Sequence, residues 1–106
     1  MDLIELPAPI EFEWDKGNRE KNLNRHGVSI QECESVFLNT KTYLFKDLRH
    51  SSMDERRLVL FGISSNSRLL TIVFTLRRDR IRIISARDMS RKEKKIYEEK
   101  TRHTKI

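Results

Sequence analysis

Apolar and polar residues alternate along several short segments of the chain, and this period of two is typical of half-buried β-strands. The pattern predicts a first strand at 10–14, where apolar residues alternate with glutamates, and a short one at 42–45. Three longer strands are predicted at about 56–63, 68–75 and 80–87, joined by turns short enough for hairpins. Because sequential strands joined by short turns pair antiparallel, we expect a small antiparallel sheet.

Two helices are predicted after the first strand. Asp15 can cap a helix over 16–25, and Gly27 follows it in the position of a helix-ending glycine. Ser29 forms a capping box with Glu32, which predicts the start of a second helix. The apolar residues of this second helix fall on one face: Ile30, Cys33, Val36 and Phe37.

A third helix is predicted after the last strand. Ser90 and Glu93 form a second capping box, from which the helix would run to about residue 100. The order of strand, helix pair, strands and final helix is typical of an α+β domain whose helices cover one face of its sheet. The 106 residues suit a single domain over 1–106. Two prolines favour an irregular arm at 1–10.

Charge is distributed unevenly along the chain. Residues 1–76 carry 10 basic and 11 acidic side chains, whereas residues 77–106 carry 12 basic and 5 acidic ones. The formal net charge of +6 therefore comes from the last strand and helix. Such a local excess favours binding to a polyanion such as RNA. A solvated lysine-rich helix without a ligand would have the same composition.

Composition and residue spacing disfavour several classes of protein. The single Cys33 cannot form an internal disulfide, which indicates a reducing cytoplasm. The three histidines, His26, His50 and His103, lie outside any metal-binding spacing, so neither a metal nor a cofactor is expected. No apolar run is long enough to span a membrane, and the amino-terminal residues do not have the pattern of a signal peptide.

Arginines are the side chains from which phosphate chemistry would be expected here. Strand alternation places Arg80 and Arg82 on one face of the last strand. It places Arg87 on the other face with Ile81 and Ile83, at the rim of the core. Guanidinium groups bind phosphate oxygens through paired hydrogen bonds, which suits an RNA backbone. Arg80 and Arg82 could equally be surface residues paired with nearby acids.

Other residues near this strand are further candidates for binding RNA. Those in the preceding turn and on the final helix are Arg77, Arg78, Lys94 and Lys95. Tyr97 of the same helix could stack on a base or hydrogen-bond a phosphate. It could instead be a half-buried anchor for the helix.

A series of short motifs extends over about residues 11–98. They are Phe12-Glu13-Trp14-Asp15, Asn22-Leu23, His26-Gly27-Val28-Ser29, Val36-Phe37, Glu55-Arg56, Ile81-Arg82-Ile83-Ile84-Ser85-Ala86-Arg87, Glu93 and Tyr97. In this order and spacing they resemble the BrnT toxins of bacterial type II toxin–antitoxin systems. The resemblance implies a RelE-like fold and a metal-independent endoribonuclease that inhibits translation. It also implies a cognate BrnA-like antitoxin with a ribbon-helix-helix part, and binding to operator DNA only through the toxin–antitoxin complex.

The resemblance also indicates site residues. It places important family residues at Arg87, at His26 and, after the acidic loop, at Arg56. RNA is cut without a metal when its 2′-hydroxyl attacks the adjacent phosphate, so the protein must move protons and stabilise charge. Arg87 suits charge stabilisation, and the candidate proton carriers are His26, Glu55 and Tyr97.

Two other functions are compatible with the same sequence. A non-catalytic nucleic-acid-binding or repressor-complex subunit would need only the basic surface. An interaction domain would bind a partner chain through an exposed strand or through the acidic residues before residue 16, and an oligomer is also possible. Cleavage of RNA in a chelator would distinguish the ribonuclease from the non-catalytic binder, whose binding would be salt-dependent.

Overall fold

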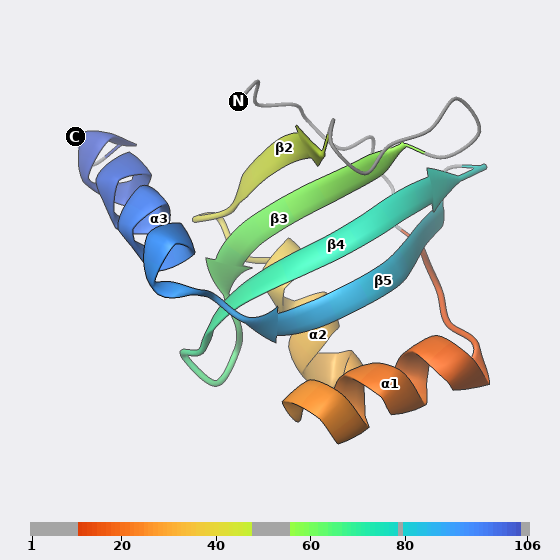
Figure 1. The fold of residues 1–106 in the computed structure, drawn as a ribbon. Coiled ribbons are helices and arrows are strands. Elements are labelled where there is room, and N and C mark those ends of the chain that lie inside the picture. Colours follow the sequence, from red (N-terminus) through yellow and green to blue (C-terminus); the bar gives the residue numbers. More distant parts are fainter. Residues whose placement is uncertain (1–10, 48–55, 79, 105–106) are drawn as a thin grey trace.

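The computed structural model describes residues 11–47, 56–78 and 80–104, which form three helices and a five-stranded sheet (Figure 1). The elements are β1 (Glu11–Glu13), α1 (Lys16–His26), α2 (Ile30–Phe37), β2 (Tyr43–Asp47), β3 (Arg57–Ile63), β4 (Leu69–Arg77), β5 (Arg80–Asp88) and α3 (Arg91–Thr104). The predicted α+β class is therefore confirmed, whereas the predicted arm at 1–10 lies outside the described residues. None of the helices in the described part of the chain is long and apolar enough to cross a membrane.

The sheet is mixed, with the strand order β1-β5-β4-β3-β2. Strands β2 to β5 form the predicted antiparallel meander, but β1 runs parallel to β5, with Glu11 opposite Arg80 and Glu13 opposite Arg82. The prediction of a wholly antiparallel sheet is therefore wrong. Short turns determine the direction of strands that follow one another, and no such turn joins β1 to β5.

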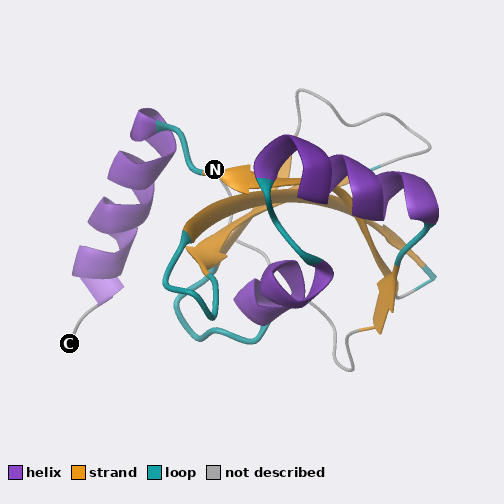
Figure 2. Cartoon of the chain, turned by 90° about the horizontal axis from the view of Figure 1, so that it is seen from below, coloured by secondary structure: helices purple, strands orange, loops and turns teal. Residues whose placement is uncertain are grey.

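Helices α1 and α2 lie on the same face of the sheet (Figures 1 and 2). Cys33 and Val36 of α2 pack against Leu44 and Leu60 in the larger of two apolar clusters. Gly62 of β3 allows this close approach, since a Cβ atom there would lie 2.6 Å from Cγ1 of the buried Val36. The sheet face that α2 covers is thus closed to ligands.

Helix α1 packs along β5. Its Asn22 is buried, and the Oδ1 atom accepts a hydrogen bond of 2.9 Å from the backbone N–H of Ala86. Strand β1 pairs with β5 only at residues 80–82, so Asn22 satisfies a β5 amide beyond that pairing. Gly27 ends the helix with a positive φ of 65°, as predicted from its position.

Helix α3 packs on the opposite face, at one end of the sheet (Figure 1). Tyr97 lies in the second apolar cluster with Tyr43, Phe45 and Phe61, whose side chains point away from α2. The Tyr97 hydroxyl also donates a hydrogen bond of 2.8 Å to the carbonyl oxygen of Lys41. The prediction that all helices cover one face is therefore wrong. These aromatic strand residues form an apolar area on the second face, and α3 covers it.

Cys33 provides a test of this packing. Its side chain is 1% exposed. Burial, assisted by the nearby carboxylates of Glu34 and Glu32, raises the pKa of the thiol to about 12. We therefore expect no reaction with a disulfide reagent such as DTNB at neutral pH in the native protein, and complete reaction in guanidinium chloride. Rapid labelling of the native protein would contradict the placement of α2.

Candidate functional site

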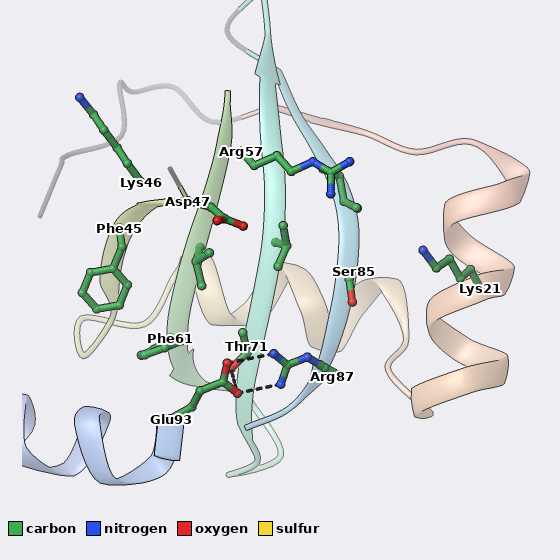
Figure 3. A pocket seen from close by; sticks show the side chains of 13 residues that line it. Lys21, Phe45, Lys46, Asp47, Arg57, Phe61, Thr71, Ser85, Arg87 and Glu93 are labelled. Atoms are coloured by element: carbon green, nitrogen blue, oxygen red, sulfur yellow. Dashed lines mark hydrogen bonds and ion pairs between the residues drawn. The ribbon is translucent and has the colours of Figure 1, made fainter. Parts of the chain in front are cut away.

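The face of the sheet opposite α1 and α2 carries a groove of about 570 Å³ (Figure 3). Its floor includes aliphatic side chains from three strands, which are Val59, Val73 and Ile84. Its charged lining residues come from three strands and two helices, and they are Lys21, Lys46, Asp47, Arg57, Arg87 and Glu93. Four of these six residues are basic and two are acidic, so the groove favours an anionic ligand that also has apolar parts.

A β-bulge interrupts β5 at the groove. Val73 of β4 lies opposite Ser85, whereas the next residue of β4, Phe74, lies opposite Ile83. Ile84 therefore has no opposing residue on β4. An extra residue of this kind shifts the alternation of faces by one position along the strand.

The bulge decides which face Arg87 occupies. Ile81 and Ile83, before the bulge, are buried on the helix-covered face, and Ala86 joins the same cluster after it. Arg87 consequently lies on the groove face, as does Arg82. The prediction that Arg87 shares a face with Ile81 and Ile83 is therefore wrong, because strict alternation does not hold across a bulge.

The Arg87 guanidinium is held in place by Glu93 of α3 (Figure 3). Its Nη1 and Nη2 atoms donate to Oε1 and Oε2 of Glu93 at 2.7 and 2.9 Å. Nη1 also donates to the carbonyl oxygen of Asp88 at 3.0 Å. These bonds occupy the Nη1–Nη2 edge, and the pairing with Glu93 raises the pKa of Arg87. Within the described part of the chain, no acceptor contacts the Nε–H, so the Nε–Nη2 edge can bind a ligand.

Glu93 joins Arg87 to two further elements. Its Oε1 accepts hydrogen bonds from the backbone N–H of Ser90 at 2.8 Å and from the hydroxyl of Thr71 at 3.0 Å. The N–H of Glu93 donates to Ser90 Oγ at 3.2 Å, which confirms the predicted capping box. Burial alone would raise the pKa of Glu93, but the hydrogen bonds from Arg87, Ser90 and Thr71 lower it to about 2. Glu93 is thus an anion at neutral pH.

Neither of the predicted proton carriers that the structure describes lines the groove. His26 lies at the end of α1, where its carbonyl oxygen accepts a hydrogen bond of 2.6 Å from Arg68. Tyr97 is 3% exposed. Its place in the second apolar cluster and its hydrogen bond to the carbonyl oxygen of Lys41 correspond to the alternative in which Tyr97 anchors the helix. Glu55 lies outside the described residues.

Arg57 is a groove residue that sequence reasoning missed. Strand alternation places Arg57 on the same face of β3 as Val59 and Phe61, but no sequence signal shows that this face stays open beside α3. Arg56, which the family resemblance indicated, is exposed just before β3 and does not line the groove.

Arg80 and Arg82 lie beside acidic residues of β1 and of the segment that follows β1. Nε of Arg80 lies 3.4 Å from Oε2 of Glu11. Nη1 and Nη2 of Arg82 lie 3.7 and 2.9 Å from carboxylate oxygens of Glu13 and Asp15. These contacts correspond to the alternative in which both arginines pair with nearby acids.

The remaining basic candidates lie outside the groove. Arg77 ends β4 and Arg78 follows it in the turn, and both are exposed. Lys94 and Lys95 are exposed on α3. The structure thus separates one basic groove from a more diffuse basic surface.

A comparison with protein families decides the class of this chain. The model of BrnT, the ribonuclease toxin of type II toxin–antitoxin systems, matches residues 14–93. The chain belongs to the BrnT toxin family. The match extends over most of the chain and includes every described residue that lines the groove. No individual curated protein matches the chain significantly. The resemblance drawn from the motifs is therefore confirmed, and membership of the BrnT family implies a type II ribonuclease toxin with an antitoxin as its partner.

Proposed function

We propose that this BrnT-family protein is a RelE-like, metal-independent endoribonuclease that cleaves RNA in the groove and thereby inhibits translation. The observation that carries the proposal is the state of Arg87. Its guanidinium is fixed by Glu93, and its Nε–Nη2 edge is available beside a net positive groove. A donor that is already oriented stabilises charge that develops on a phosphate without having to reorganise.

In the proposed reaction the 2′-oxygen of the RNA forms a bond to the adjacent phosphorus while the bond from phosphorus to the 5′-oxygen of the next nucleotide breaks, which gives a 2′,3′-cyclic phosphate and a 5′-hydroxyl. Water accepts the proton of the 2′-hydroxyl and donates one to the departing 5′-oxygen. Negative charge accumulates meanwhile on the non-bridging oxygens. The Nε–Nη2 edge of Arg87 donates two parallel hydrogen bonds to these oxygens. Lys21, Lys46 and Arg57 attract the flanking phosphates. The groove itself thus supplies the positive charge that a divalent ion would provide in a metal-dependent nuclease.

The shape of the groove favours an unpaired strand of RNA. Its aliphatic floor suits contact with a base, and bases are accessible in this way only when they are unpaired. Arg57 lies opposite Thr75 of β4 and Arg87 lies opposite Thr71. Four residues along a strand correspond to about 13 Å, so the two arginines suit different phosphates of one strand.

Incubation of the purified protein with RNA in EDTA tests this function. We expect RNA fragments that end in a 2′,3′-cyclic phosphate or a 3′-phosphate. Cleavage that requires an added divalent ion would contradict metal independence. Tight, salt-dependent binding without any cleavage would instead support the non-catalytic nucleic-acid-binding or repressor subunit.

Arg57→Ala is expected to weaken RNA binding and to reduce the slope of log K against log salt concentration by about 1, because one phosphate contact is lost. Fluorescence anisotropy with a non-cleavable RNA analogue would measure both quantities. Arg25→Ala is the matched control, since Arg25 is exposed on α1 and lies outside the groove. Equal losses of affinity in the two variants would show that RNA does not bind in the groove.

For the partner we propose a cytoplasmic BrnA-like antitoxin with a ribbon-helix-helix part, and contact with operator DNA only through the complex. A net positive groove is well covered by an acidic segment of a partner. We expect growth arrest on expression of the toxin and rescue by the antitoxin. A structure of the complex that leaves Arg87 fully open would count against direct masking.

A further inference from the structure

Glu93 takes part in two arrangements at the same time. A capping box needs one carboxylate oxygen to accept the N–H of Ser90, and Oε1 of Glu93 fulfils this role. Oε2 is different, because among the described residues its hydrogen-bond partner is Nη2 of Arg87. The second oxygen is therefore not required by the helix cap.

The carboxylate of Glu93 is held from three elements. Thr71 of β4 is 1% exposed and donates to Oε1, and Ser90 before α3 donates to the same atom. Arg87 of β5 completes the set with its paired hydrogen bonds. An arginine side chain has several rotatable bonds, and a bidentate partner that cannot itself rotate restricts them to one orientation.

The pair uses one particular edge of the guanidinium. Glu93 occupies the Nη1–Nη2 edge, while the carbonyl of Asp88 takes a further Nη1 hydrogen. A guanidinium carries donors in a fixed plane, so holding one edge also fixes the direction of the other. An unrestrained arginine could present either edge to a phosphate.

We propose that Glu93 is a positioning residue for RNA cleavage, which fixes the guanidinium plane of Arg87 so that the Nε–Nη2 edge meets the scissile phosphate. This inference rests on the function proposed for the groove. It makes the first turn of α3 part of the active site, although Glu93 itself need not touch RNA.

Glu93 has opposite effects on the affinity for RNA and on the orientation of Arg87. Its negative charge partly cancels the attraction between Arg87 and RNA, so Glu93 is unfavourable for affinity alone. Orientation of a reacting group instead raises the rate of the chemical step. Positioning therefore predicts a change in kcat without a loss of affinity.

Glu93→Gln separates the two arrangements. Glutamine can still accept the Ser90 N–H in a capping box, but its amide places N–H donors against the donors of Arg87. We expect kcat for RNA cleavage to fall by about 10- to 100-fold, the scale of a misplaced catalytic group, with KM unchanged or lower. The NMR signal of the Arg87 Nε–H should also change from one defined position toward the averaged position of exposed arginines.

Ser29→Ala is the matched control for helix stability. It removes the equivalent cap of α2, where Ser29 Oγ accepts the Glu32 N–H at 3.1 Å, and Ser29 lies outside the groove. We expect a lower Tm with kcat unchanged at a temperature where the protein is folded. A Glu93→Gln variant whose kcat equals that of the parent, or falls no further than that of Ser29→Ala, would overturn the inference. A parent that cleaves no RNA would refute the proposed function instead.

Discussion

Replacing Arg87 with alanine is expected to lower the rate of RNA cleavage by about a hundred- to a thousandfold, the typical loss for one oriented donor of this kind. The variant loses the Nε–Nη2 edge that we assign to the phosphate oxygens. Glu93 keeps its hydrogen bonds from Ser90 and Thr71, so α3 should remain docked. Single-turnover cleavage of a labelled RNA would measure the effect, and growth arrest on induced expression should disappear in parallel.

Arg87→Lys tests whether the shape of the guanidinium is required in addition to its positive charge. It keeps the positive charge, but an ammonium group cannot pair with both oxygens of Glu93 and also present a planar edge to the phosphate. We expect most of the activity to be lost in this variant as well. Circular dichroism and the Tm of both variants would confirm that they are folded. If Arg87→Ala cleaves RNA at the parental rate, Arg87 is not the catalytic arginine.

Arg68→Ala is expected to lower the free energy of unfolding by about 2 kcal/mol, because the buried carboxylate of Glu32 loses a charged hydrogen-bond donor. Arg68 precedes β4 and joins three other parts of the fold. Its Nε lies 2.7 Å from Oδ1 of Asp88, and its Nη1 lies 3.3 Å from Oε1 of Glu32. It also donates to the carbonyl oxygens of His26 and Gly27, at the end of α1. Without it, the carboxylate of Glu32, which is 6% exposed, would stay buried with less compensation.

Urea denaturation of the parent and Arg68→Ala would measure the loss. Arg77→Ala is the control, since Arg77 is exposed at the end of β4 and should change stability little. Adding Glu32→Gln to Arg68→Ala should restore part of the stability, because the uncompensated charge is then absent. Equal stability of Arg68→Ala and Arg77→Ala would show that the Arg68 contacts contribute little to the fold.

The local elements of this fold could be predicted from the sequence, whereas their relative placement could not. Every helix and strand lies near its predicted position, because capping boxes, the glycine after α1 and strand alternation are local signals. The direction of β1 and the face covered by α3 depend on contacts between distant residues. The bulge at Ile84 is visible only in the pairing of β5 with β4.

The candidate site could also be predicted only in part, because local sequence signals do not show which distant side chains meet. Arg87 was identified through the family resemblance, and Glu93 through its spacing from Ser90, but nothing local linked the two side chains. Their pairing depends on α3 crossing the end of β5 on the groove face. Residue type does not distinguish Arg57 from its neighbour Arg56, and only the packing of α2 shows which face of β3 remains open.

The parallel pairing of β1 with β5 has a consequence for synthesis of the protein. Residues 11–13 pair with residues 80–82, which lie far along the chain. The groove likewise combines Lys21 with Glu93, which are distant in the sequence. Contacts between residues so far apart form later than those of the local meander. We therefore expect unfinished chains that stop before β5 to lack both a docked α1 and Arg87. The ribosome that makes this toxin would then meet an active molecule only after residues 80–93 have emerged.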